Sequence, residues 1–221
     1  MSISDNLKLI QERIDIAAEK SRKNGSDITL VAVTKTVPVD MVNEAIKLGV
    51  TDIGENRVQE FLSKEAELLP VNKHLIGHLQ SNKVKQIAGK VSLIHSVDSV
   101  NLLREINSVS EKLGIKQDFL MQINVSKEES KFGMRVDEVD EFINVAETFE
   151  NVNLRGIMTI PPISDNDEFL KNIFLRTREI FENSKKTFDI LSMGMSSDFE
   201  LAIECGANMI RVGSSIFGFR V

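Results

Sequence analysis

The 221-residue sequence is poor in several residue types, and each shortage excludes a class of protein. Cys205 is the only cysteine, so the chain forms no intramolecular disulfide and no cysteine-based metal cluster. No apolar run approaches the length of a membrane span, and the amino-terminal segment lacks the apolar core of a signal peptide. The formal net charge of −6 lacks the basic excess expected of a nucleic-acid-binding protein. We therefore expect a cytoplasmic protein with no nucleic-acid or membrane partner and no metal site.

The order of the predicted elements indicates one architecture. An opening helix is expected over 5–24, where Leu7, Ile10 and Ile14 recur at helical spacing and Gly25 ends the pattern. Short apolar runs then predict strands near 28–35, 51–54, 73–77, 92–96, 118–125, 154–159, 188–193 and 208–212. Amphipathic stretches between them predict helices near 39–48, 56–68, 81–89, 99–113, 136–148, 167–184 and 197–205. Strict alternation implies parallel strands, and eight repeats without a Pro/Gly/Ser-rich linker predict a single (β/α)8 TIM-type barrel over residues 1–221.

The first predicted strand ends in a lysine. The run TLVAVTK (Thr29–Lys35) is apolar and β-branched almost to its end, as expected of a strand buried on both faces. The amine of Lys35 would then extend beyond the carboxyl end of the strand, where α/β folds bind their ligands. Such an amine can form a Schiff base with a carbonyl compound, although a strand-end lysine that only reaches for water gives the same pattern.

Polar clusters follow several other predicted strands. The second strand leads into Gly54, Glu55 and Asn56, and the third into Gly77 and His78. Taken singly, such residues are ordinary in turns and helix caps. In a barrel, however, the carboxyl ends of all strands meet on one face, which carries the active site in this architecture. The recurrence of polar clusters therefore predicts a ligand site on that face.

The last two clusters have the chemistry of a phosphate site. In GMSSDFELA, Ser196 and Ser197 precede a predicted helix, so hydroxyls and backbone N–H groups converge at its positive end. Gly213 and Ser214 follow the eighth strand, and the loops after strands seven and eight are the usual phosphate cradle of this fold. Arg211 lies two residues before Gly213, so strand alternation puts both on one side. An amine, a guanidinium and a phosphate cradle around one space describe a site for pyridoxal 5′-phosphate (PLP).

Seven motifs carry a resemblance that spans nearly the whole chain. They are VAVTK, GENRVQEF, HLIGHLQSNK, NVSKEESKFGM, LRGIMTIPP, LSMGMSSDFELAI and IRVGSSIFG, in this order. With them the chain resembles the YggS/PROSC family of pyridoxal phosphate homeostasis proteins, which is similar in turn to the amino-terminal barrel of bacterial alanine racemase. The resemblance implies that Lys35 holds PLP covalently as an internal aldimine and that Arg211 faces the pyridine nitrogen. It further implies a cofactor site lined by Asn56, Ser196, Ser197, Gly213 and Ser214.

The resemblance implies a PLP-binding protein of intracellular PLP homeostasis without established catalysis. PLP-dependent apoenzymes are the implied protein partners, and we expect a monomer. Racemisation needs a group on each face of the Cα carbanion. In racemases similar to this barrel, the second group is a tyrosine from an additional domain; this sequence has no tyrosine and its length leaves no room for that domain. His78 could substitute, but we expect it only to line the pocket, so we predict no catalytic residue.

Two alternatives stay open from the sequence. One is a low-activity PLP-dependent amino-acid racemase. The other is a Schiff-base aldolase on the same fold, in which Lys35 attacks a sugar phosphate directly and Arg211 has no ring to address. The position of Arg211 favours PLP. A permanent cation near the ring nitrogen discourages protonation of the ring, which weakens it as an electron sink and suits a carrier better than a demanding enzyme.

Overall fold

Eight parallel strands form a closed barrel in the computed structural model, which describes residues 2–126 and 132–218. The strands pair in chain order, and the last one pairs back onto the first through Val31 and Arg211. They are β1 (Thr29–Val33), β2 (Asp52–Glu55), β3 (Asn72–Leu75), β4 (Leu93–Val97), β5 (Gln117–Gln122), β6 (Val152–Met158), β7 (Ile190–Ser192) and β8 (Met209–Val212). The predicted (β/α)8 barrel is confirmed, and each predicted strand overlaps an observed one. Part of the NVSKEESKFGM motif, residues 127–131, lies outside the described residues.

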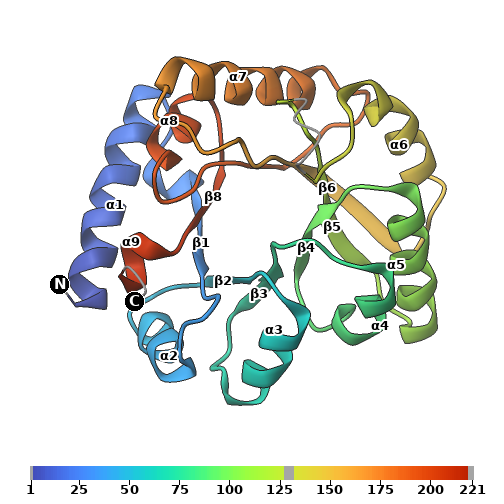
Figure 1. Ribbon diagram of the computed structural model, residues 1–221, viewed down its shortest axis with the longest axis horizontal. Helices are drawn as coiled ribbons and strands as arrows, with labels where there is room; N and C mark the ends of the chain where they lie inside the picture. The colour runs from blue at the N-terminus through green and yellow to red at the C-terminus, as the bar shows by residue number, and fades with distance from the viewer. Residues whose placement is uncertain (1, 127–131, 219–221) are drawn as a thin grey trace.

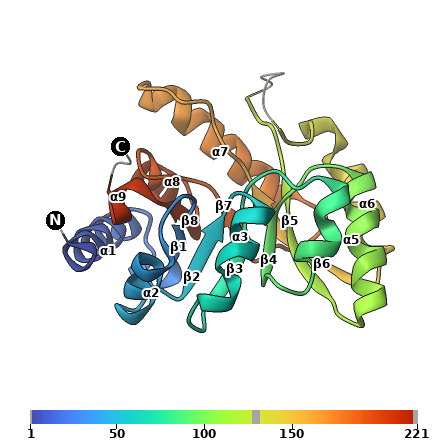
Figure 2. The same ribbon diagram turned by 60° about the horizontal axis from the view of Figure 1, so that its bottom comes forward.

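Helices surround the barrel on its outer side (Figures 1 and 2). They are α1 (Ile3–Lys20), α2 (Val39–Lys47), α3 (Val58–Lys64), α4 (Val84–Ile87), α5 (Val100–Leu113), α6 (Val139–Ala146), α7 (Asp167–Asn183), α8 (Phe199–Glu204) and α9 (Ser214–Phe217). Short 3₁₀ turns add η1 (Gly25–Asp27), η2 (Glu65–Glu67), η3 (Ser81–Lys83) and η4 (Val136–Glu138). Among the described residues, no helix combines the length and apolar character needed to cross a membrane.

The boundaries of α1 follow from its end residues. Ser2 and Asp5 form a capping box, since each side chain accepts a hydrogen bond from the backbone N–H of the other at 3.1 Å. The predicted end at Asn24 was wrong: α1 ends at Lys20, and Arg22 has a left-handed φ of 58°. The chain turns away here because Lys23 Nζ donates to the carbonyl of Gly206, 2.8 Å away, which ties the turn to the α8–β8 connection.

The helix α9 was not predicted from the sequence. The segment after β8 was expected to be a loop of the phosphate cradle, but Gly213 caps one helical turn there. Four residues are too few to show helical periodicity, so the pattern carries no signal for α9. The turn closes the molecule beside α1, where Asn6 Nδ2 donates to the carbonyl of Ile216 at 2.8 Å (Figure 1).

The barrel wall separates two apolar clusters. The inner cluster consists of Val31, Leu93, Leu120, Met158 and Met209. The outer cluster is larger and packs the other face of the strands against the helices. Successive strand residues point to opposite faces, so Ala32 and Ile94 lie in the outer cluster next to their inward-facing neighbours. This alternation determines which polar residues of the strands enter the barrel interior.

Candidate functional site

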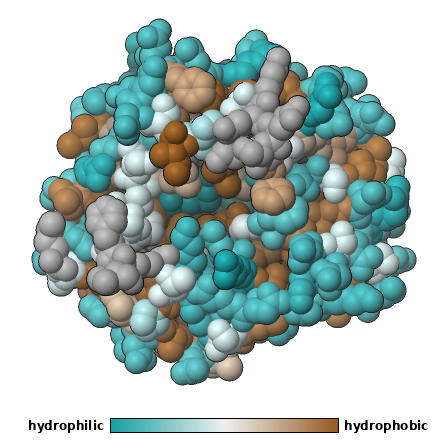
Figure 3. All heavy atoms as spheres, in the orientation of Figure 1, coloured by the Kyte–Doolittle hydropathy of each residue, from teal (hydrophilic) through white to brown (hydrophobic). Residues whose placement is uncertain are grey.

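A cavity of about 520 Å³ lies at the carboxyl end of the barrel. All seven sequence-predicted site residues line it: Lys35, Asn56, Ser196, Ser197, Arg211, Gly213 and Ser214. The remaining lining is mostly apolar: Val33, Ile76, Ile160, Ile163, Met195, Ser215 and Gly218. Figure 3 shows a hollow near the centre of the face that Figure 1 presents, over this end of the barrel. The fold therefore brings residues from positions 33 to 218 around one space of ligand size.

Lys35 is an exposed residue two positions beyond the end of β1. Its neighbours are held on both sides. The carbonyl of Thr34 accepts a hydrogen bond from Lys64 Nζ at 2.8 Å, and the N–H of Thr36 donates to Glu60 Oε1. Thr36 has a φ of 59°, a conformation that few non-glycine residues adopt and that these bonds support. The backbone at Lys35 is therefore fixed, while its side chain is exposed and lines the cavity.

Lys64 is the centre of the contacts that hold this backbone. We call the group of Thr34, Glu55, Glu60 and Lys64 the Lys64 cluster. Its ammonium group donates at 2.8 Å to the Thr34 carbonyl, to Glu55 Oε1 and to Glu60 Oε1, so its three N–H bonds have three acceptors. Glu55 is 1% exposed, and its second oxygen, Oε2, has no partner in the described structure. Burial raises the pKa of Glu55, against the opposing hydrogen bonds from Lys64 and Thr34.

Arg211 lies on β8, the strand next to β1, and its side chain is buried. Its guanidinium donates from NH1 to Ser192 Oγ at 2.6 Å and from NH2 to the carbonyl of Thr159 at 2.9 Å. Burial lowers the pKa of Arg211 to about 10, and the negative charge of Asp198 opposes this shift. The side chain is therefore a cation at neutral pH, with part of its surface on the cavity.

The loops after β7 and β8 are joined where serine hydroxyls line the cavity. The N–H of Gly213 donates to Ser196 Oγ at 3.2 Å. A Cβ atom at Gly213 would lie 3.2 Å from both Cβ and the carbonyl oxygen of Val33, so glycine lets this turn pack closely against β1. Ser214 begins α9, where the first-turn N–H groups lack acceptors within the helix. Hydroxyl and amide donors therefore gather here without a lysine cluster.

Asn56 contributes an unsatisfied polar atom. Its Oδ1 is buried without a hydrogen-bond partner in the described structure, and the residue lines the cavity. A Cβ atom at Gly77 would lie only 2.1 Å from the carbonyl oxygen of Asn56, so the turn after β3 packs tightly on this residue. A buried acceptor of this kind is costly unless a ligand or water satisfies it.

His78 does not line this cavity, contrary to the sequence expectation. Its ring stacks on Phe132 with the centroids 4.1 Å apart, and Nδ1 lies 3.6 Å from Asp98 Oδ2. The sequence correctly placed His78 just after the third strand, but it gave no information on its stacking partner, Phe132. Burial raises the pKa of Asp98.

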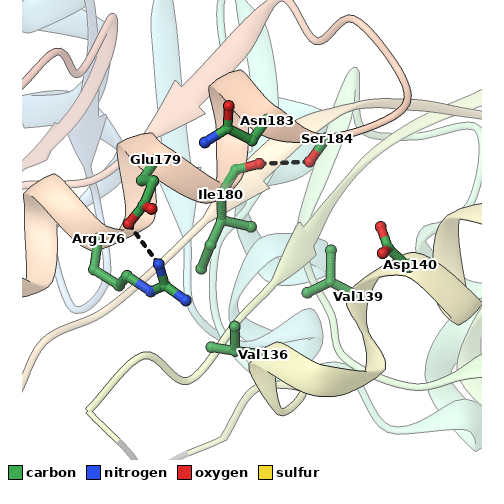
Figure 4. A pocket seen from close by; sticks show the side chains of 8 residues that line it. All are labelled: Val136, Val139, Asp140, Arg176, Glu179, Ile180, Asn183 and Ser184. Atoms are coloured by element: carbon green, nitrogen blue, oxygen red, sulfur yellow. Dashed lines mark hydrogen bonds and ion pairs between the residues drawn. The ribbon is translucent and has the colours of Figure 1, made fainter.

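A second cavity, of about 200 Å³, lies between the η4–α6 segment and α7 (Figure 4). Three of its polar side chains already bond locally: Arg176 pairs with Glu179, and Ser184 Oγ donates to the carbonyl of Ile180. None of the sequence-predicted site residues lines it. The chemistry is therefore concentrated in the cavity at the carboxyl end of the barrel.

Together, the barrel and the cavity define a class: a (β/α)8 protein that binds a small ligand at the carboxyl ends of its strands. The family model described as alanine racemase, N-terminal domain, matches residues 6–221. The chain is 40% identical to a pyridoxal phosphate homeostasis protein of Aquifex aeolicus over 226 residues, covering all of this chain and 99% of that protein. It therefore belongs to the family of pyridoxal phosphate homeostasis proteins, built on the alanine racemase amino-terminal domain, and the resemblance drawn from its motifs is confirmed.

We compare two of the solved structures that are similar to this chain. PipY of Synechococcus elongatus, determined with PLP bound, has a TM-score of 0.85 and 30% identity, covering 98% of this chain and 100% of that one. An alanine racemase of Clostridium difficile has a TM-score of 0.79 at 17% identity, covering 98% of this chain but 60% of that one. The second comparison supports the fold alone.

Proposed function

We propose that this protein binds PLP in the cavity at the carboxyl end of the barrel and serves PLP homeostasis. The observation that carries the proposal is the meeting of Lys35, Arg211 and the serine hydroxyls in one cavity of about 520 Å³. An aldehyde, a pyridine nitrogen and a phosphate group are the three features of PLP that such groups recognise. The names of the Aquifex relative and of the PLP-bound PipY structure support the same ligand.

The buried acceptor at Asn56 supports the fit of the cofactor. Asn56 Oδ1 has no partner among the described residues, so a polar ligand in the cavity would satisfy it. The close packing at Gly213 keeps the β8–α9 turn free of a side chain where the donors converge. These residues leave room and bonding capacity for a phosphorylated ring.

Each residue has a chemical role in this proposal. When bound, PLP would supply an aldehyde that a primary amine can attack, and Lys35 is the cavity-lining residue with such an amine. Ser196, Ser214 and the nearby amides hold the phosphate, with Ser197 at the same rim. Arg211 presents a permanent cation to the ring nitrogen and disfavours a second positive charge there. Asn56 hydrogen-bonds a polar substituent of the ring.

We further propose that the protein holds PLP without turning over amino acids. Of the described residues that line the cavity, Lys35 and Arg211 are the titratable ones, and only a lysine can serve as a base. The sequence has no tyrosine, and His78 is occupied with Phe132 and Asp98 outside the lining. One base can exchange a proton on one face of a carbon but cannot efficiently deliver it to the other.

Borohydride reduction tests the attachment. The purified protein is mixed with one equivalent of PLP, reduced, digested and analysed by mass spectrometry, with Lys83→Ala as a lysine-removal control outside the cavity lining. We expect the label on Lys35, its loss in Lys35→Ala and its retention in Lys83→Ala. A label that survives Lys35→Ala at full stoichiometry would refute the assignment.

Incubation of the PLP-loaded protein with L-alanine in deuterium oxide tests the absence of turnover. We expect slow exchange of the Cα proton with retained configuration, because one amine works from one face. Sustained racemisation that disappears in Lys35→Ala, with contaminating racemase excluded, would instead establish the alternative function of a slow amino-acid racemase.

A further inference from the structure

A continuous chain of hydrogen bonds crosses the interior of the barrel and ends at Arg211. Asp52 Oδ1 lies 3.0 Å from His74 Nε2, and His74 Nδ1 lies 2.9 Å from His95 Nε2. His95 Nδ1 lies 3.2 Å from Ser192 Oγ, which in turn accepts from Arg211 NH1 at 2.6 Å. We call these residues, from β2, β3, β4, β7 and β8, the barrel chain. All of them are buried.

Strand alternation explains why these polar residues meet inside the barrel. His95 follows Leu93 by two residues and Arg211 follows Met209 by two, and both apolar residues belong to the inner cluster. Parallel pairing sets Gly54 beside His74, which brings the preceding inward residue of β2, Asp52, within reach of the imidazole. The barrel chain therefore runs from the amino end of β2 to the cavity at the opposite end.

The two ends of the barrel chain determine its direction. A guanidinium has no acceptor, so Arg211 can only donate to Ser192 Oγ. An ionised carboxylate has no donor, so Asp52 can only accept from His74. Burial acts to raise the pKa of Asp52, but the hydrogen bonds from His74 and Thr51 outweigh it and keep the pKa below its ordinary value. The carboxylate is therefore ionised at neutral pH.

The direction assigns a proton to one nitrogen of each imidazole. Arg211 cannot accept, so among the described partners of Ser192 Oγ only His95 Nδ1 can accept the hydroxyl hydrogen. His95 then donates from Nε2 to His74 Nδ1, and His74 donates from Nε2 to Asp52. Burial, together with the positive charge of Arg211, holds the pKa of His95 well below its ordinary value, consistent with a neutral ring. Each of the three inner members, Ser192, His95 and His74, uses one donor and one acceptor within the barrel chain.

We propose that the barrel chain orients Arg211 toward the cavity, with His95 and Ser192 as positioning residues for a ligand that carries a ring nitrogen. The hydroxyl of Ser192 can rotate about its own bond, and His95 selects the rotation that leaves a lone pair for Arg211 NH1. The carbonyl of Thr159 holds NH2. Since two anchors fix a planar group, the remaining guanidinium N–H bonds present one arrangement to the cavity. The identity of the ligand rests on the proposed function; the orientation of Arg211 does not.

Nitrogen NMR of the ligand-free protein tests the direction. The chain has three histidines, and His78 lies outside the barrel chain, so His78→Gln identifies the two buried rings. We expect the proton of His74 and that of His95 on Nε2. A proton on Nδ1 of either ring would overturn the assigned direction. We also expect separate, slowly rotating Arg211 guanidinium signals that average in Ser192→Ala; averaged signals in the wild type would overturn the positioning role.

Ligand binding tests the consequence. We compare PLP with an analogue in which carbon replaces the ring nitrogen, in the wild type, Ser192→Ala, His95→Leu, His95→Gln and the control His78→Gln. Ser192→Ala and His95→Leu should weaken PLP at least tenfold but the analogue less than threefold, because only PLP uses the guanidinium through its nitrogen. His95→Gln, which keeps an acceptor and a donor, should bind PLP within threefold of the wild type, as should His78→Gln.

The outcomes separate this proposal from a structural role. Equal weakening of both ligands would mean that the barrel chain only supports packing, and unchanged PLP binding in Ser192→Ala would mean that Arg211 needs no support; either result overturns the proposal. If His95→Leu fails to fold by circular dichroism, Ser192→Ala and the wild-type NMR still decide. A wild type that binds no PLP would refute the proposed function, while the proton positions and guanidinium signals would still test the orientation of Arg211.

Discussion

Replacing Lys64 by methionine should destabilise the protein through the Lys64 cluster. The Lys64 side chain is 12% exposed, and its ammonium group has three acceptors at 2.8 Å: the carbonyl of Thr34 and the carboxylates of Glu55 and Glu60. Methionine retains most of the volume but none of the donors. The variant therefore leaves the carboxylate of Glu55, whose side chain is 2% exposed, without its cation. Breaking a buried ion pair in this way costs about 3–5 kcal/mol, much more than forming the pair contributes.

Protonation of Glu55 limits this loss and gives it a pH dependence. Because burial raises the pKa of the Glu55 carboxyl in the folded state, the folded protein binds its proton more tightly than the unfolded chain does. The free energy of unfolding therefore rises as the pH falls through the raised pKa, in a window above the ordinary value of 4.5. Without Lys64 to oppose burial, the window moves to higher pH. We expect the cost of Lys64→Met to be smaller at pH 5 than at pH 8.

Urea unfolding followed by far-ultraviolet circular dichroism measures the effect, since the chain lacks tryptophan and tyrosine for fluorescence. The matched control is Lys90→Met, which removes a single ion pair to Glu65 from a side chain that is 45% exposed. That pair should contribute at most about 1 kcal/mol. Adding Glu55→Gln to Lys64→Met should restore part of the stability, because a neutral amide needs no cation.

Similar losses in Lys64→Met and Lys90→Met would refute the argument from burial. A failure of Glu55→Gln to restore any stability would show that Glu55 is not the group left unpaired. We also expect Lys64→Met to weaken the binding of PLP, because the Lys64 cluster holds the backbone on both sides of Lys35. Unchanged PLP affinity in a folded variant would show that the position of Lys35 does not depend on the cluster.

Three further predictions concern the phosphate, the pH dependence and the cysteine. Ser196→Ala with Ser214→Ala should weaken PLP far more than pyridoxal, by about 1.5–3 kcal/mol for each lost charge-assisted bond; equal losses in a binding titration would locate the phosphate elsewhere. Glu55→Gln should flatten the wild-type rise in unfolding free energy between pH 7 and pH 5, and an unchanged slope would contradict the raised pKa. Cys205 is buried, which raises the pKa of its thiol, so iodoacetamide should alkylate it only after denaturation; rapid labelling of the folded protein by mass spectrometry would contradict this.

The strands and the cavity lining could be predicted because both depend on local patterns. Apolar, β-branched runs such as Thr29–Val33 form strands wherever they are buried on both faces. The carboxyl ends of parallel strands meet on one face, so Lys35, Asn56 and Ser214 come together although they are far apart in the chain. The error at His78 has the same origin: the pattern located the turn after β3 but not the partners of its side chain.

The sequence by itself determined the order of the elements, the closed barrel and the face that carries the site, because residue periodicity and strict alternation leave few arrangements. Only the tertiary structure decided which buried polar groups pair. Lys64 and Thr34 are 30 positions apart in the chain, and His95 and Ser192 are 97 positions apart. The folding of the barrel brings each pair into contact, and no local pattern encodes these contacts. His95 stands inside an apolar run, which is a signal of a buried polar contact, but the sequence does not name its partner. Charges and hydrogen bonds act over a few ångströms in space, so the closure of the barrel had to bring them together first.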